Sequence, residues 1–516
     1  MKLLFYHDPA TELGRPFFWK YFVQWAARMR RAVPAFECRF LLPDTMVEWA
    51  AIQGIAPTEI VWVREDQLRN SCGDPPGNWN RFWFEKRFTT EQADGAAAFV
   101  LQCLRGFAPD VIVTHSPVPF LRTAFPDSPI LHFESGLLKF APFPMSFYFD
   151  PVGFFRDSYL IRNKDRLRSL TITAQQQSEL ESLRRLFLTD LLIPKSPFRA
   201  TMNQYKDRFR RRILLPLQFG NYFGFDSACR FHSQFEFARW VLERTPADVG
   251  VVMTEHIYFE QMEQEALRFL RSSFPNLIYD PLFDDYNSSS QFLLGDVDAV
   301  VTVTSSVGMQ SLWWRKPLIA VGASHLETAA DGDDPAQVHE IIDRGWPGWK
   351  DPFLHWLLTH YYIPESYVYS DTWLPEFLEK IRASGGELAP IDGESRLFET
   401  IRQGVLTDIG RPSSHPARAF EIAAAERLAA LHDMKAEADR RGDLVQQLNT
   451  SLQQAAERST QLESALADLH ETAVQRSVSI NRITAEADRR QVLVDELTAA
   501  VRHRDEKLKR WRWLIR

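Results

Sequence analysis

The chain has 516 residues, a net charge of −7, 45% hydrophobic residues and 25% charged residues. This composition predicts a globular protein and disfavours a nucleic-acid binder, which usually carries a basic excess. No apolar run reaches the about 20 residues that a membrane-spanning helix needs, and the four cysteines form no CxxC pair, so we expect a cytoplasmic protein with reduced thiols.

The first region, residues 1–205, alternates predicted strands and helices. Strands are expected at Lys2–Tyr6, where His7-Asp8-Pro9 ends the strand, and at Ile60–Val63, Pro109–Thr114 and Pro129–Phe133; helices are expected at Phe17–Arg31 and Thr90–Arg105. This alternation predicts a parallel sheet with crossover helices, whose ligands bind beyond the carboxyl ends of the strands. His115 and Glu134 follow strands of this sheet.

The second region, residues 206–335, begins with the basic stretch Lys206–Arg212 and repeats the pattern. Strands are expected at Arg212–Gln218, Val249–Thr254, Asn276–Tyr279, Asp298–Val303 and Lys316–Gly322, with a helix at Ser233–Glu243. These elements predict a second Rossmann-type domain. The remaining helices, over residues 336–415, are expected to pack back across both domains.

The third region, residues 416–516, predicts a long coiled-coil helix. From Leu431 to Leu508, 23 positions follow one another in steps of three and four, and 18 of them are apolar or alanine. A polar helix of this length is marginal without a partner, so we expect self-association into a homo-oligomer. The tip, Lys507–Arg516, interleaves basic and aromatic residues, which suits either a membrane interface or a frayed basic helix end.

Polar residues follow several of the predicted strands. The set comprises Glu134, Asp226, His256 and the pair Ser305/Ser306. Each alone is more often a cap or turn residue, but together they predict a site in the cleft between the two domains. The serine pair opens a helix, so it is either a phosphate site or a simple N-cap.

The absence of several known motifs leaves some classes of binding site without support. The sequence has no GxxxxGK[ST], GxGxxG or HExxH motif, so neither an ATP P-loop, an NAD site nor this zinc site is indicated. Asp331–Asp334 has the spacing of a metal-binding DxD motif, but it follows no clear strand, and we interpret it as a solvated loop.

Asp298–Gly322, with its strand, Ser-Ser-x-Gly turn, helix and Lys-Pro strand, resembles the donor domain of bacterial capsule-polysaccharide synthesis proteins of the retaining β-Kdo transferase type. Leu215-Pro216-Leu217-Gln218 followed by Asp226 resembles the family's PLQ…D element. Glu134-Ser135-Gly136 and Asp150–Gly153 resemble two elements of its acceptor half. The resemblance covers about residues 1–410; one departure is Ile257, which follows His256 where the family has proline.

The resemblance implies a metal-independent GT-B glycosyltransferase with no cofactor, which transfers Kdo or a related ulosonic acid from a CMP-sugar to a glycan acceptor in capsule or O-antigen assembly. It implies the following roles: Asp226 and Glu134 are catalytic, while His256, Ser305, Ser306, Gly308 and Gln218 bind the donor nucleotide. The acceptor is expected to be lipid-linked, with the protein at the inner face of the cytoplasmic membrane. A degenerate scaffold that organises other transferases, and a UDP-sugar-dependent GT-B enzyme, remain the alternative interpretations.

Overall fold

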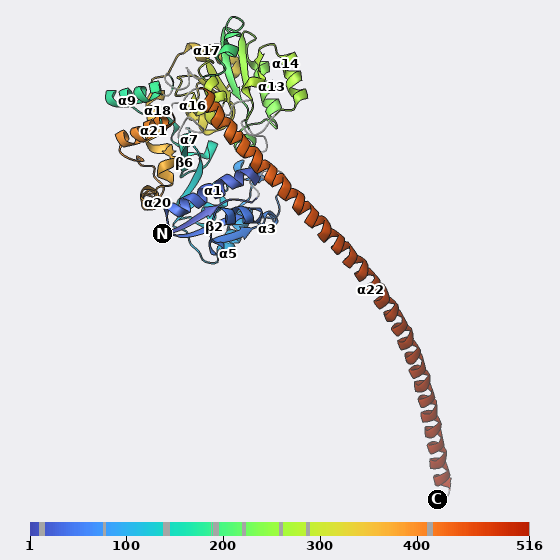
Figure 1. The fold of residues 1–516 in the computed structure, drawn as a ribbon. Coiled ribbons are helices and arrows are strands. Elements are labelled where there is room, and N and C mark those ends of the chain that lie inside the picture. The colour runs from blue at the N-terminus through green and yellow to red at the C-terminus, as the bar shows by residue number, and fades with distance from the viewer. Residues whose placement is uncertain are drawn as a thin grey trace. The chain divides into compact units, whose positions relative to one another are not determined.

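The computed structural model describes residues 1–9, 16–75, 79–137, 145–186, 188, 196–218, 223–256, 262–284, 289–409 and 416–514. The chain divides into two units, Met1–Leu428 and Ala429–Arg516 (Figure 1). The strands are β1 (Lys2–Tyr6), β2 (Glu37–Pro43), β3 (Ile60–Val63), β4 (Val111–Thr114), β5 (Ile130–Ser135), β6 (Ser146–Asp150), β7 (Arg211–Pro216), β8 (Val249–Thr254), β9 (Leu277–Ile278), β10 (Ala299–Thr302), β11 (Leu318–Ala320) and β12 (Ile363–Pro364). The helices are α1 (Pro16–Ala32), α2 (Val47–Ile52), α3 (Glu65–Ser71), α4 (Trp79–Phe84), α5 (Thr90–Leu104), α6 (Phe120–Ala124), α7 (Tyr159–Arg162), α8 (Lys164–Arg168), α9 (Ala174–Arg185), α11 (Arg199–Asn203), α12 (Phe223–Asp226), α13 (Gln234–Arg244), α14 (Gln264–Ser273), α15 (Ser289–Leu293), α16 (Ser306–Gln310), α17 (Val338–Asp343), α18 (Lys350–Trp356), α19 (Glu365–Val368), α20 (Trp373–Ser384), α21 (Glu394–Ile409) and α22 (Pro416–Leu514).

The first sheet has seven strands in the order β12-β6-β5-β4-β1-β2-β3. Its five strands from β5 to β3 are parallel, and β6 and β12 extend it with antiparallel pairing. The parallel part has the Rossmann strand order, which reverses direction between β1 and β4 and creates a switch point there. The sequence analysis predicted no strand at the positions of β2, β6 and β12.

The second sheet is entirely parallel in the order β11-β10-β7-β8-β9, with its switch point between β7 and β10. Residues of α13, α14 and α17 cover one face and build a core of their own with the strands. The predicted α/β class with two Rossmann-type sheets is confirmed.

A continuous hydrophobic core joins the two sheets of the first unit. It contains Leu3 and Phe5 of β1 together with Leu214 of β7 and Val300 of β10. Side chains of α18, α20 and α21 complete this core. The two sheets are therefore parts of one packed body.

Buried ion pairs fix the segment that contains α18. Asp351 accepts hydrogen bonds from Arg184 at 2.7 Å and from Arg315 at 2.8 Å. Lys350 donates to Asp331 Oδ2 at 2.5 Å, and that carboxylate also accepts from the Leu318 amide. The interpretation of Asp331 as part of a solvated loop is therefore wrong: its side chain is 10% exposed and ion-paired.

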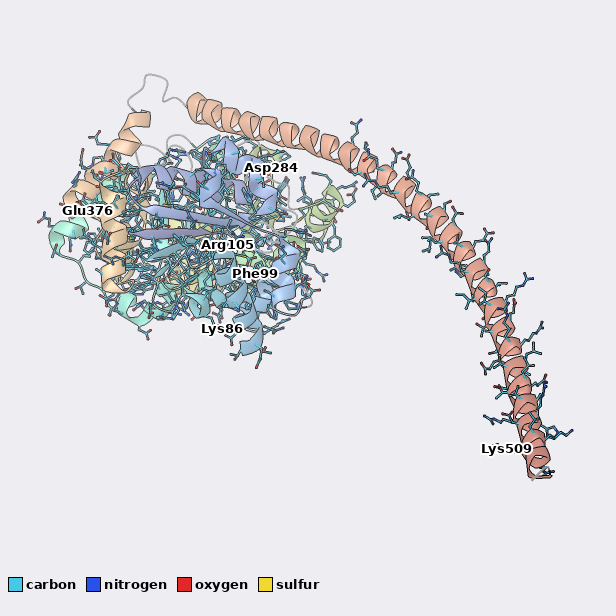
Figure 2. All side chains as sticks on the ribbon, turned by 90° about the horizontal axis from the view of Figure 1, so that it is seen from below. Lys86, Phe99, Arg105, Asp284, Glu376 and Lys509 are labelled. Carbon is cyan, nitrogen blue, oxygen red and sulfur yellow. The ribbon has the colours of Figure 1, made fainter. Side chains whose placement is uncertain are left out.

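The second unit belongs to one helix, α22, whose described side chains, such as Lys509, project along its length (Figure 2). The predicted long helix is confirmed, and the coiled coil stays a prediction. Over the described residues, no helix is both long and apolar enough to cross a membrane.

Candidate functional site

The switch point of the second sheet gathers several of the predicted site residues. Gln218 follows β7, Thr304 to Ser306 follow β10, and His256 follows β8. Strands β10, β7 and β8 are neighbours and parallel, so the residues after them share one edge of the sheet. Residues 219–222 and 257–261, which flank this edge, lie outside the described residues.

Gln218 holds the turn that follows β10. Its amide Nε2 donates to Thr304 Oγ1 at 2.7 Å, and its Oε1 accepts from the Thr304 backbone N–H at 3.0 Å. Gln218 and Thr304 are both buried. The amide end of this side chain is thus engaged with the protein, which makes Gln218 a positioning residue for the serine pair.

The serine pair begins α16. Ser305 is its N-cap, and its hydroxyl accepts from the Val307 amide at 3.3 Å. Both serines are partly exposed, while the rest of α16 is buried. Packing explains why residue 308 is a glycine. A Cβ there would lie 2.7 Å from Leu326 Cδ1, so the absence of a side chain lets α16 approach the sheet. The arrangement places two partly exposed hydroxyls at the start of a five-residue helix.

Asp226 is the last residue of α12 and is 8% exposed. Helix α12 contacts α4 of the first domain, so Asp226 lies where the two domains meet. The catalytic role predicted for Asp226 and the nucleotide contact predicted for His256 both stay predictions.

The switch point of the first sheet carries a second polar cluster, of which only His115 was predicted from the sequence to lie at a ligand-binding strand end. His7 and Asp8 follow β1, and His115 and Ser116 follow β4. The Ser116 hydroxyl accepts from the Asp8 amide at 2.8 Å, and the rings of His7 and His115 are 6.0 Å apart. All four residues are buried. The position of His7-Asp8 directly after a strand was the signal, but it was interpreted only as a strand end.

Glu134 lies beside this cluster on β5. Its Oε1 accepts from the backbone N–H and the hydroxyl of Ser135, at 2.7 and 2.8 Å. Its Oε2 is 3.5 Å from His115 Nε2. Because His115 Nδ1 donates to the Phe133 carbonyl at 2.9 Å, Nε2 is the nitrogen that faces the Glu134 carboxylate.

One hydrogen bond joins the Glu134 side to the serine side. Gln310, at the end of α16, donates from Nε2 to the Leu137 carbonyl at 3.1 Å, and Leu137 lies three residues after Glu134. In the 3₁₀ turn His325–Thr328 of the second domain, burial lowers the His325 pKa to about 4, and the Glu134 charge opposes this effect. The structure thus places Glu134 and the serine pair at one domain junction.

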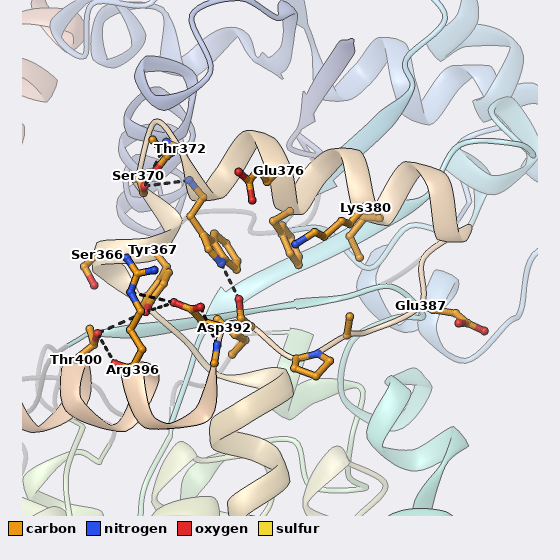
Figure 3. Close-up of a pocket in the computed structure, with 17 residues that line it drawn as sticks. Ser366, Tyr367, Ser370, Thr372, Glu376, Lys380, Glu387, Asp392, Arg396 and Thr400 are labelled. Carbon is orange, nitrogen blue, oxygen red and sulfur yellow. Dashed lines mark hydrogen bonds and ion pairs between the residues drawn. The ribbon is translucent and has the colours of Figure 1, made fainter.

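A cavity of about 730 Å³ lies away from both polar clusters, between α20, α21 and the segment that joins them (Figure 3). Figure 3 shows Asp392 between Tyr367 and Arg396, with the Tyr367 hydroxyl donating to the carboxylate at 2.9 Å. Its lining contains none of the predicted site residues. Among the described side chains, no group of three or more His, Cys, Asp or Glu is placed to hold a metal ion.

Comparisons with known proteins bear on the second domain. Residues 192–331 match the family model described as "Capsule polysaccharide biosynthesis protein". No curated protein gives a significant match.

The similar solved structures include KpsC, a β-Kdo 2,7 transferase of Thermosulfurimonas dismutans, at 15% identity and a TM-score of 0.34 over 59% of this chain and 89% of that one. The calicheamicin glycosyltransferase CalG4 matches at 12% identity and a TM-score of 0.32 over 80% of this chain and 99% of that one. The UDP-GlcNAc 2-epimerase of Neisseria meningitidis matches at 13% identity and a TM-score of 0.26 over 79% of this chain and 100% of that one. These TM-scores are too low to support an argument about this chain.

The matched segment contains all five strands of the second sheet, and with them the turn that Gln218 and Thr304 hold. Through residues 192–331, the chain is similar to the capsule polysaccharide biosynthesis protein family.

Proposed function

We propose that this protein is a GT-B glycosyltransferase of bacterial capsule or O-antigen assembly. It transfers Kdo or a related ulosonic acid from a CMP-sugar to a glycan acceptor, with retention. One observation carries the proposal: Gln310 ties the helix that begins with the serine pair to the loop after Glu134. The serine hydroxyls, which we assign to anion binding, and the His115–Glu134 pair, which we assign to proton transfer, therefore lie at one junction. The family match supports the class of protein.

On the donor side, Ser305 and Ser306 bind the single phosphate of CMP. The Gln218 amide fixes the turn that presents them, so the site needs little reorganisation when the nucleotide arrives. His256 contacts the nucleotide from the neighbouring strand end, and Gly308 allows the helix to sit close to the sheet. One phosphate carries little enough charge for these donors to hold it without a metal ion.

Asp226 acts at the anomeric carbon. A ketosidic carbon beside a carboxylate reacts through an oxocarbenium-like state, which a second carboxylate can stabilise or trap covalently. Trapping followed by attack of the acceptor gives retention, because the configuration inverts twice. Glu134, coupled to His115, takes the proton from the acceptor hydroxyl.

The test compares CMP and UDP as stabilisers of the full-length protein in a thermal-shift assay. CMP is expected to raise the melting temperature more than UDP, since only a ligand of the native state stabilises it. Replacing both Ser305 and Ser306 by Ala should remove most of the CMP response, at a stability cost of about 1 kcal/mol for the lost cap. An equal CMP response in this variant would reduce the serine pair to a helix cap, and a stronger response to UDP would favour the UDP-sugar alternative.

Turnover is then measured as CMP release from CMP-Kdo with a glycan acceptor. Asp226→Ala should abolish turnover and keep the CMP thermal shift, because the lost carboxylate acts on the sugar. If the wild-type protein binds CMP but releases none from CMP-Kdo, the scaffold alternative becomes the better explanation.

For the tail we propose a homo-oligomeric coiled coil that keeps the enzyme near membrane-bound, lipid-linked acceptors. Ten apolar seam residues are 52–70% exposed on the single helix: Leu452, Leu462, Leu466, Leu469, Ile480, Ile483, Val494, Leu497, Val501 and Leu508. A partner helix would cover this stripe.

Leu466→Lys/Leu469→Lys in the full-length protein should lower the mass measured by light scattering to that of a monomer. Val474→Lys/Val478→Lys is the matched control, because these exposed valines lie off the seam. The coiled-coil proposal fails if both double variants keep the same mass, and vesicle co-sedimentation tests the membrane contact separately.

A further inference from the structure

A second, smaller cavity of about 390 Å³ lies in the first domain, beside the carboxyl end of β4. Pro117–Pro119, which follow that strand, form one wall, and the segment Val152–Ser158 after β6 forms another. Trp83 and Phe84 at the end of α4 contribute aromatic lining. The volume is within the range of small-molecule sites.

The lining of this cavity is strongly basic. It contains Lys86, Arg122, Arg156 and Arg162, against one carboxylate, Asp157. This excess of positive charge is local, since the whole chain carries −7. Lys86 Nζ is 3.5 Å from Asp157 Oδ1, so the one acid is already engaged by one of the bases.

Two of the cations are held in place by the backbone. Arg122 donates to the carbonyls of Pro151 and Val152, both at 3.0 Å. Arg156 donates to the Phe84 carbonyl, and its guanidinium lies 5.0 Å from the centre of the Phe84 ring. The carbonyls that receive these bonds are neutral, so the guanidinium charges remain available to an anion.

The other two cations, Arg162 and Lys86, are exposed and adjustable; Lys86 is labelled at the surface in Figure 2. The Arg122 pKa is lowered, first by burial and then by the like charge of Arg162. An anion between the two guanidiniums would offset that like charge, and guanidiniums pair with carboxylates through two parallel hydrogen bonds.

The wall formed by residues 152–158 is itself rigid. The buried Asp150 carboxylate accepts hydrogen bonds from the amides of Val152, Gly153 and Tyr159, at 2.8, 3.0 and 2.8 Å. Phe155 in this segment has a positive φ of 49°, an uncommon conformation for an aromatic residue that these anchors support. Strained backbone of this kind tends to occur at ligand sites.

One side chain connects the cavity with the proton-transfer pair. Phe154 lines the cavity, and its ring lies 5.9 Å from the His115 ring and 5.0 Å from the His132 ring. His115 is the residue whose Nε2 faces Glu134. Phe154, which is 1% exposed, thus packs between the cavity lining and the His115–Glu134 pair.

We propose that this cavity binds an acidic sugar residue of the glycan acceptor through its carboxylate. The proposal rests on the glycosyltransferase function and names the substrate class of its acceptor side. The basic side chains pair with the carboxylate of this sugar.

The experiment measures binding of tri-galacturonate, maltotriose and inorganic phosphate to the full-length protein by isothermal titration calorimetry. Tri-galacturonate is expected to bind, with an affinity that falls as salt is raised, and maltotriose is expected not to bind. Lys86→Gln/Arg162→Gln should weaken tri-galacturonate binding about tenfold or more, because two charge-assisted partners are lost. These residues are exposed, so the fold should be retained.

Lys380→Gln/Arg382→Gln on α20 is the matched control: it removes the same charge from an exposed helix elsewhere and should leave binding unchanged. Equal binding of maltotriose, or equal loss in both double variants, would overturn the proposal. Inorganic phosphate binding as tightly as the trisaccharide would show a general anion site and overturn the assignment to a sugar. The CMP thermal shift of Lys86→Gln/Arg162→Gln should match wild type, so failure of the donor assignment and failure of this one give different results.

Discussion

The variant Gln218→Ala tests whether the Gln218 side chain holds the turn that follows β10. The substitution removes both side-chain bonds to Thr304 and a longer contact, at 3.4 Å, from the Thr302 hydroxyl. Thr304 is 6% exposed, so water cannot readily replace the partner of its N–H. An unsatisfied buried donor costs about 1–3 kcal/mol, and the lost side-chain volume adds to it, which predicts a total loss of about 2–4 kcal/mol.

The free energy of unfolding is measured by urea denaturation followed by tryptophan fluorescence, and CMP affinity by calorimetry. Gln218→Ala should weaken CMP binding as well as stability, because the unlocked turn no longer presents the serine pair. Thr302→Val is the matched control: it removes only the 3.4 Å contact at constant volume, so its stability loss should stay below about 1 kcal/mol. If Gln218→Ala costs no more than Thr302→Val, the amide does not lock the turn.

Two further predictions concern packing and pH. Gly308→Ala should lose about 1–3 kcal/mol of stability in the same urea assay, because the new methyl group would overlap Leu326; a loss below about 0.5 kcal/mol would mean that Leu326 moves freely. Asp351→Asn should lose about 3 kcal/mol at neutral pH, because the Arg184 side chain, 3% exposed, would lose a charged partner. Burial alone would raise the Asp351 pKa, but Arg315 and Arg184 bring it down to about 2. A depressed folded-state pKa stabilises the protein above the unfolded value of about 4, so the difference between wild type and Asp351→Asn should shrink as the pH falls from about 4 to 2, and a constant difference would contradict the pairing.

The strands that the sequence predicts well are those with uninterrupted apolar residues. Lys2–Tyr6, Ile60–Val63 and Val249–Thr254 have the predicted bounds. Strand β2, with Glu37 and Arg39 in a seven-residue run, lacks such a pattern. Strand β12 has only two residues and exists because it pairs with β6, more than 200 positions away in the chain, which no local signal reports.

The candidate site was predictable in its residue types but not in its assembly. Strand order decides which strand ends become neighbours, and the order β5-β4-β1-β2-β3 arises from tertiary packing. For this reason Glu134 and His115 were each predicted at a ligand-binding strand end, but their pairing was not predicted, and His325 was not identified. The Gln310 contact joins residues 173 positions apart and likewise has no local signature.

The role of Gln218 shows why a motif match and a structural role can differ. A family element that contains a glutamine beside a nucleotide site suggests a direct contact with the nucleotide. Here both ends of the Gln218 amide bind the protein at 2.7–3.0 Å, and Ser305 and Ser306 remain partly exposed at the helix start. The glutamine therefore holds the turn, and on the proposed function its replacement should change CMP affinity and stability together, whereas loss of the serine hydroxyls should change affinity far more than stability.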